Sequence, residues 1–156
     1  MRQRYGALGV VTLIIGLLVA AAPAHADTAR VNFSVDEPFG SDAGVIVSSS
    51  LPNCGNGTVE TVSASSRSIG AEGMRFRGTK VVHCDSGATL EFRYVATYRS
   101  CASPIDWGRW RVTGGTGVYD GARGGGFLVG NYTGGGGTAC DSTGITDIWF
   151  GAVFLR

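Results

Sequence analysis

The chain has 156 residues, of which 26 are glycine, and its 13 Lys and Arg side chains against 12 Asp and Glu give a formal net charge of +1. A charge this close to balance excludes a strong electrostatic case for binding nucleic acid or an anionic membrane. The length is that of one domain of ordinary size with a single core.

Residues 1–26 have the features of a secretory signal peptide. Arg2 and Arg4 form a basic start, the stretch from Ala7 to Ala22 is nearly all apolar, and Ala24-His25-Ala26 is a small-residue cleavage site. We therefore expect cleavage after Ala26 and one mature domain over residues 27–156. Removing the two leader arginines brings the net charge near −1. No second long apolar run follows that could anchor the product, so we expect a protein secreted to the extracellular space.

The mature part shows strand-like alternation and no helical period. The clearest case runs from Ala88 to Tyr98, where apolar and polar side chains alternate. Seven further strands are expected near Arg30 to Asp36, Gly44 to Ser49, Thr58 to Ala64, Met74 to His83, Trp107 to Thr113, Gly126 to Tyr132 and Ile145 to Leu155. Glycines cluster between these runs, as the turns of an antiparallel sheet require.

Eight strands with one apolar face each predict an all-β fold. A single antiparallel eight-stranded β-barrel is the first choice and a β-sandwich the alternative. The last strand is apolar on both faces, so something must cover its outer side. A neighbouring subunit of a homo-oligomer is the favoured cover, with the N-terminal segment and the long glycine-rich connection as alternatives.

The four cysteines of the mature part, Cys54, Cys84, Cys101 and Cys140, predict two disulfides. Three connectivities exist, and hairpin geometry discriminates between them, because residues facing each other across an antiparallel pair are equally far from the turn. A Cys54–Cys84 bond centres on Ile69 in a loop, and a Cys101–Cys140 bond centres between Asp120 and Gly121. A Cys84–Cys101 bond would centre inside the best strand. We therefore predict Cys54–Cys84 and Cys101–Cys140.

The glycine-rich run from Trp110 to Gly126, WRVTGGTGVYDGARGGG, is the most distinctive stretch. From Gly115 to Gly121 its spacing is one residue too long for a dinucleotide-binding motif, and a strand follows instead of a helix. A P-loop would need a lysine after the last glycine. The run therefore predicts a hairpin turn, and we expect no cofactor. We also expect no metal, because the chain has no C-x-x-C pair and the mature part has one histidine, His83.

This turn resembles the glycine-rich turn of the allene oxide cyclase and dirigent-protein superfamily, in which G-G-T-G-x-[FY]-x-x-A-R-G is typical. The turn residues of this run are Gly114, Gly115, Gly117, Tyr119, Gly121, Arg123 and Gly124, and all of them except Gly121 stand at fixed positions of the pattern. Small exported actinobacterial proteins with such a barrel often show the same turn, and the composition of the leader suits that source. The resemblance implies an eight-stranded antiparallel barrel, in agreement with the strand count.

The resemblance also implies chemistry in a barrel interior. Allene oxide cyclases hold an unstable epoxide near a glutamate, and dirigent proteins orient phenoxy radicals between aspartates. The candidates by residue type here are Glu91, Asp106, Asp120 and Asp147, although no motif ties any of them to those roles.

Glu91 is the best single candidate for an acid or base if the polar strand faces line the interior. The simpler interpretation is structural: Glu91 and Arg93 share a face, as do Arg109 and Arg111 on the next strand, which predicts a cross-strand ion-pair ladder. We expect Asp147, beside Trp149, at the barrel rim.

Four aromatic residues are candidates for lining a ligand cavity: Tyr94, Tyr98, Trp110 and Trp149. Core packing is the competing interpretation for the two tryptophans, and Tyr119 is expected to anchor the turn. The sequence favours a secreted, non-catalytic barrel that binds a small apolar ligand or a protein partner. The alternative is a cofactor-free isomerase or cyclase acting on a hydrophobic substrate inside the barrel.

Overall fold

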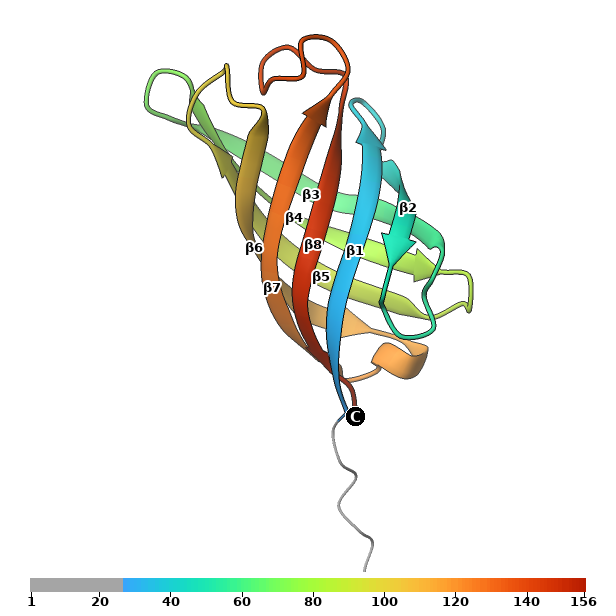
Figure 1. Cartoon of the computed structure of the whole chain (residues 1–156). Coiled ribbons are helices and arrows are strands. Elements are labelled where there is room, and N and C mark those ends of the chain that lie inside the picture. The colour runs from blue at the N-terminus through green and yellow to red at the C-terminus, as the bar shows by residue number, and fades with distance from the viewer. Residues whose placement is uncertain (1–26) are drawn as a thin grey trace, which may run out of the picture.

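Residues 27–156 are described by the computed structural model, and they form one closed barrel of antiparallel strands (Figure 1). Each strand pairs with its neighbours in the sequence, and the last strand closes the barrel against the first. The strands are β1 (Thr28–Pro38), β2 (Ala43–Ser49), β3 (Gly57–Ile69), β4 (Gly73–Cys84), β5 (Thr89–Tyr98), β6 (Ile105–Gly115), β7 (Arg123–Thr133) and β8 (Gly144–Phe154). The predicted eight-stranded barrel is confirmed, and the sandwich alternative is wrong. The predicted signal peptide lies outside the described residues.

The strand predictions miss most at the end of β3. The alternation ends at Ala64, but β3 continues to Ile69 and stays paired with β4 through the serine-rich stretch Ser65–Ser68. Residues 62–68 are exposed throughout, so they leave no apolar pattern in the sequence. Backbone pairing with β4 extends this strand instead.

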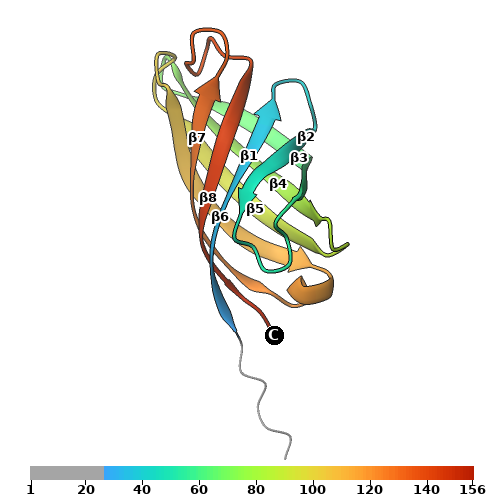
Figure 2. The same cartoon turned by 45° about the vertical axis from the view of Figure 1, so that its right-hand side comes forward.

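The barrel has two different ends (Figures 1 and 2). The β1–β2, β3–β4, β5–β6 and β7–β8 loops lie at one end, which we call the mouth. The β2–β3, β4–β5 and β6–β7 connections and the C-terminus lie at the other, the closed end. Residues are located by whether they lie near the mouth or near the closed end.

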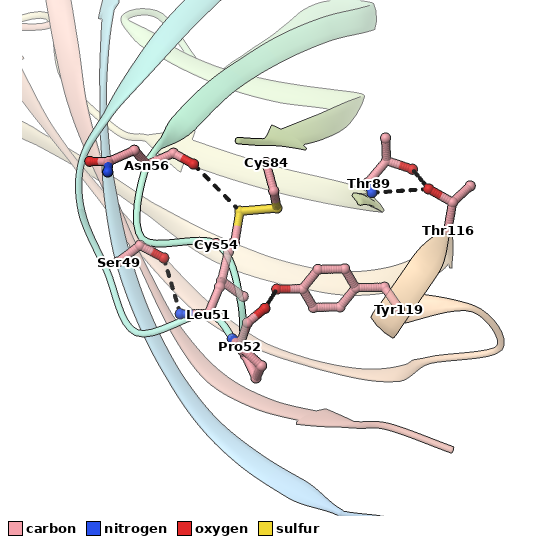
Figure 3. The surroundings of a disulfide bond; sticks show 9 residues. All are labelled: Ser49, Leu51, Pro52, Cys54, Asn56, Cys84, Thr89, Thr116 and Tyr119. Atoms are coloured by element: carbon pink, nitrogen blue, oxygen red, sulfur yellow. Dashed lines mark hydrogen bonds between the residues drawn. A yellow bond between two sulfur atoms is a disulfide. The ribbon is translucent and has the colours of Figure 1, made fainter. Parts of the chain in front are cut away.

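Both predicted disulfides are present, one at each end. Cys54–Cys84 joins the β2–β3 connection to the end of β4 at the closed end (Figure 3). Cys101–Cys140 joins the β5–β6 loop to the β7–β8 loop at the mouth. These last two cysteines lie beyond the paired ends of β6 and β7, and the backbone N–H of Cys140 donates to the carbonyl of Cys101 at 3.3 Å.

The glycine-rich run is the β6–β7 connection at the closed end. Gly114 and Gly115 end β6, and a single 3-10 turn (η1, Gly117–Tyr119) follows. Gly117 and Gly121 have φ of 61° and 66°, a left-handed conformation that glycine adopts without a steric penalty. The turn therefore shapes the closed end.

Tyr119 fixes this turn to the opposite connection. Its side chain is fully buried, and its hydroxyl donates a 2.5 Å hydrogen bond to the carbonyl of Pro52, next to the Cys54–Cys84 bond (Figure 3). Thr116, at the start of the turn, bonds to both the backbone N–H and the hydroxyl of Thr89. The closed end is thus sealed by contacts between three connections.

Inward-facing side chains fill the interior of the barrel, and the fully buried Phe33, Phe92, Trp149 and Leu128 form its centre.

The outer face of β8 is apolar as well: Phe150 and Phe154 are 40% and 46% exposed, and the Phe150 ring stacks on Phe127 of β7 with ring centres 5.9 Å apart. The expectation that a second subunit covers this face stays a prediction. No helix among residues 27–156 is long and apolar enough to cross a membrane.

Candidate ligand-binding site

A cavity of about 350 Å³ opens at the mouth of the barrel. Its walls are mainly aromatic and aliphatic, with four charged or ionisable side chains of Asp, Glu and Lys among them. The lining residues are Glu37, Phe39, Phe76, Lys80, Tyr94, Ala96, Asp106, Leu128, Tyr132, Ala139, Ile145 and Asp147. An apolar pocket with a few convergent polar groups is the ordinary form of a small-molecule site.

Two buried carboxylates face each other across a glycine in this cavity. In the sheet, Asp106 of β6 and Asp147 of β8 both pair with Gly130 of β7, so the three residues lie in one inward-facing row. A Cβ at Gly130 would lie 2.5 Å from Asp106 Oδ1 and 2.8 Å from Asp147 Oδ1. The missing side chain therefore leaves the space that both carboxyl groups occupy.

Asp106 is held by two donors. Its Oδ1 accepts a hydrogen bond from the Gly130 backbone N–H at 3.2 Å, and its Oδ2 accepts one from the Tyr132 hydroxyl at 3.5 Å. Asp106 is 4% exposed and Asp147 is 6% exposed. Among residues 27–156, no hydrogen bond to the Asp147 carboxyl group is found, so this group is free to meet a ligand.

A buried ion pair inside the barrel joins Glu37 of β1 to Lys80 of β4. The Lys80 ammonium group donates to both carboxylate oxygens of Glu37 and also to Thr61 Oγ1 at 3.2 Å. The same ammonium group lies 5.5 Å from the centre of the Tyr94 ring. Lys80 thus provides hydrogen-bond donors to Glu37. Among the carboxyl groups of the cavity, those of Asp106 and Asp147 have no hydrogen bond from a basic side chain.

Burial changes the proton affinity of both aspartates. It raises the pKa of Asp106 to about 6, although the hydrogen bonds from Gly130 and Tyr132 oppose the shift. It raises the pKa of Asp147 well above the ordinary value, and the negative charge of Glu37 adds to this effect while Lys80 opposes it. Asp147 therefore keeps its proton to a higher pH than an ordinary aspartate and can donate a hydrogen bond.

The tyrosines of the cavity stay protonated. Burial raises the pKa of Tyr94 to about 12, with a further contribution from the charge of Asp147. Burial also raises the pKa of Tyr132, and Asp106 adds to it. Both hydroxyl groups are therefore hydrogen-bonding groups near neutral pH and do not act as bases.

The four aromatic residues that the sequence nominates for ligand contact lie at different depths. Tyr94 lines the cavity, and Tyr98 packs behind it against Phe76 and Tyr132, with ring centres 5.9 and 6.1 Å apart. Trp110 and Trp149 are 4% and 0% exposed and lie in the aromatic cluster below the cavity. The structure brings Tyr94 to the cavity and places the two tryptophans in the core.

Glu91 lies outside the barrel. Its neighbours in β5, Leu90 and Phe92, are fully buried and point inward, so Glu91 points outward, where it accepts a hydrogen bond from Thr113 at 3.0 Å. The expected ion-pair ladder is wrong: Arg93 lies opposite Arg111, and within residues 27–156 neither arginine forms an ion pair with Glu91. Interior acid–base chemistry therefore cannot involve Glu91.

Three carboxyl groups line the cavity: Asp106 and Asp147, which the sequence nominates only by residue type, and Glu37, which it does not nominate. Asp147 is a buried wall residue instead of the rim residue expected, and Asp120 is exposed in the turn at the closed end. The signal that the sequence analysis missed is the position of each aspartate within the alternation of its strand. Asp106 alternates in step with Trp110 and Val112, and Asp147 with Trp149 and Val153, so each is a polar residue on an apolar face.

The donor groups of the cavity suit an organic ligand. They are two carboxyl groups, two tyrosine hydroxyls and a lysine already engaged by Glu37. Within the described part of the chain, no group of three or more His, Cys, Asp and Glu side chains is arranged to hold a metal ion. What the site offers is apolar contact around a small number of oxygen-recognising groups.

No protein-family model matches the chain, and a comparison with curated proteins gives no match. Among solved structures, the chain is similar to the pterocarpan synthase dirigent protein GePTS1, with 14% identity over 87% of this chain and 89% of that chain and a TM-score of 0.46. A similarity of this size carries no information on ligand or chemistry.

Proposed function

We propose that this protein is a secreted, disulfide-stabilised barrel that binds a small, mostly apolar ligand in its mouth. The supporting observation is the cavity of about 350 Å³ whose aromatic walls surround Asp106 and Asp147. The ligand carries at least one oxygen or nitrogen, because Asp106 already has two hydrogen-bond donors and an entirely apolar molecule would leave the buried Asp147 carboxyl group without a partner. Two disulfides are typical of proteins from oxidising compartments, in agreement with the predicted leader.

A cavity-filling variant with a matched outer control tests this proposal. Ala96 lines the cavity, whereas its neighbour Val95 is 39% exposed on the outer face. The neutral dye N-phenyl-1-naphthylamine brightens in apolar pockets, so we expect emission with the wild type and Val95→Phe and its loss with Ala96→Phe. Equal emission from all three proteins would refute binding in the mouth.

A second filling variant covers the case in which the first does not fold. Ala139 reaches the cavity from the β7–β8 loop, where a larger side chain disturbs no strand. We expect Ala139→Phe to lose the dye signal while its near-ultraviolet circular dichroism stays that of the wild type. Retention of the signal by a folded Ala139→Phe protein would count against the site.

The second candidate function is a cofactor-free isomerase or cyclase, and the two aspartates favour it. A carboxyl group that keeps its proton beside a carboxylate that accepts one is the pairing that general acid–base catalysis needs. Asp147 would protonate an oxygen of a hydrophobic substrate, and Asp106 would remove a proton from a neighbouring carbon. This replaces Glu91, which the structure places outside.

Turnover separates the two functions. Hydrophobic epoxides, the substrate class that the superfamily resemblance implies, can be incubated with the wild type and with Asp147→Asn, and the products followed by NMR. An isomerase converts such a substrate and loses at least about a hundredfold in rate in Asp147→Asn. A binding protein returns the epoxides at the rate of buffer alone.

A further inference from the structure

A group of arginines covers the outer side of the barrel wall formed by β3 to β6, away from the cavity. Its members share the outward face of four adjacent strands, and we call them the arginine face. They are Arg67 on β3, Arg75 and Arg77 on β4, Arg93 on β5, and Arg109 and Arg111 on β6. All but Arg75 are exposed. Figure 1 shows these four strands side by side along one half of the barrel.

The strand register brings these positive charges together. Arg67 lies directly opposite Arg75, and Arg93 lies directly opposite Arg111. Residues directly opposite each other in an antiparallel pair have Cβ atoms about 5 Å apart, and like charges there are destabilising. The strand register therefore places like-charged arginines opposite one another, which costs stability that other polar residues at these positions would not cost.

No carboxylate of the wall forms an ion pair with these arginines. The acidic residues of β3 to β6 are Glu60, Glu91 and Asp106; Asp106 points inward, Glu60 pairs with His83, and Glu91 bonds to Thr113. The ion pairs within residues 27–156 are Lys80–Glu37 and His83–Glu60. The arginine face therefore has charge and donors to offer an external anion.

The face also carries an exposed aromatic ring. Trp107 of β6 is 52% exposed and lies in the same row as Arg75, with Thr97 between them. Arg109, two residues farther along β6, holds its guanidinium group 5.3 Å from the centre of the Phe127 ring. Flat guanidinium groups bind carboxylate and sulfate in a bidentate manner, and an indole ring packs on the apolar face of a sugar.

We propose that the arginine face binds an acidic polysaccharide, a linear sugar polymer with carboxylate or sulfate groups. Charge complementarity selects an anion, which excludes the same face of a second copy. The wall is convex, so a flat membrane touches few of these arginines, whereas a flexible chain can follow the curve. The disulfides indicate an oxidising compartment, where such polymers are found and nucleic acids are scarce. The proposal is independent of the cavity and its ligand.

Acidic and uncharged polymers test the charge requirement, and two of them, dextran sulfate and dextran, share one backbone. Dextran sulfate and polygalacturonate are titrated into the purified protein at low salt, with uncharged dextran as the reference, and tryptophan fluorescence, to which the exposed Trp107 contributes, and calorimetry report binding. We expect both acidic polymers to bind and dextran not to bind. Absence of binding to both acidic polymers would overturn the proposal.

A charge-matched variant pair tests the location. Arg93→Gln/Arg111→Gln removes two charges from the face, and Arg30→Gln/Arg156→Gln removes two from β1 and the C-terminus, away from it. Both pairs change exposed side chains, so each is expected to fold. We expect about a tenfold loss of affinity in the first pair and less than about a twofold loss in the second, since contacts to ionised groups are the stronger ones.

Two results would refute the assignment. An equal loss in both variant pairs would show attraction by net charge alone. Equally tight, face-dependent binding of double-stranded DNA or of phosphatidylglycerol vesicles would overturn the polysaccharide as the partner. A tighter complex with the acidic polysaccharides than with either of these supports it.

Discussion

Asp106 and Asp147 come from strands that are not neighbours, and they meet because both pair with Gly130 on the strand between them. A residue with a side chain at that position would separate the two carboxyl groups. The site is thus made by an absent side chain as much as by the two acids. Four experiments test what this arrangement and the two ends of the barrel contribute.

Gly130→Ala is expected to disturb the mouth. The new Cβ would lie 2.5 Å from Asp106 Oδ1 and would also collide with the Ile145 side chain, so one wall must shift. We expect a loss of about 1–3 kcal/mol in the free energy of unfolding and weaker dye binding. Gly55→Ala is the control, because nothing lies within 4 Å of a Cβ at Gly55. Urea denaturation that finds the two variants equally stable would contradict the crowding.

Asp106 is expected to make the stability of the protein fall as the pH rises from about 4 to about 6. Its pKa is about 6 in the folded protein and about 4 in the unfolded chain, so the folded state binds more protons within this window. The stabilisation is full below pH 4 and lost above pH 6. The total is about 2–3 kcal/mol, because one pKa unit corresponds to about 1.4 kcal/mol.

The comparison with Asp106→Asn isolates this contribution. The asparagine side chain can still accept the hydrogen bond from the Gly130 N–H, but it does not titrate. Unfolding free energies measured at several pH values should therefore differ from the wild type in slope between pH 4 and 6. Parallel curves for the two proteins would mean that Asp106 has an ordinary pKa.

The two disulfides are expected to contribute equally to stability and unequally to binding. They close loops with sequence separations of 30 and 39 residues, and loop entropy predicts about 4 kcal/mol for each. Only Cys101–Cys140 lies at the mouth, next to Ala139 of the cavity wall. We expect Cys101→Ala/Cys140→Ala to weaken dye binding, and Cys54→Ala/Cys84→Ala to lower the melting temperature without that loss. Equal affinities of the two variants would argue against a role for the mouth disulfide.

Tyr119→Phe is expected to weaken the closed end alone. The variant loses the hydrogen bond to the Pro52 carbonyl and leaves that acceptor without its partner, which costs about 1–2 kcal/mol. Thermal unfolding should show the loss, and dye titration should show unchanged affinity. A drop in affinity would mean that the two ends are coupled.

The fold follows from the sequence where alternation and cysteine spacing are clear. The alternation of β5 and the pairing of all four cysteines are predicted correctly, because alternation is a local property and each cysteine pair is symmetric about a hairpin turn. The site is harder to predict, because three strands contribute to it and the sequence of one strand does not determine its pairing register with the others. Asp106, Gly130 and Asp147 are far apart in sequence and meet only through pairing across β7.

The choice of Glu91 shows the specific error. A carboxylate in a strand with clear polar alternation lies on the solvent face, so clear alternation is evidence against an interior role. Lys80 gives the opposite lesson: it keeps step with Val82 on the inward face of β4 and is buried in an ion pair. Net charge is a poor guide to the surface charge for a similar reason, because a near-zero total sums acids inside the barrel with arginines outside it.

The mouth disulfide also defines a replaceable part. Cys101 and Cys140 join the β5–β6 and β7–β8 loops into one cross-linked cap, while the closed end is held by its own contacts, among them the Tyr119–Pro52 hydrogen bond and the Cys54–Cys84 bond. New sequences inserted into these two loops are therefore expected to leave the strand register unchanged. The barrel is in this respect a display scaffold, on which recognition can be exchanged as a single module.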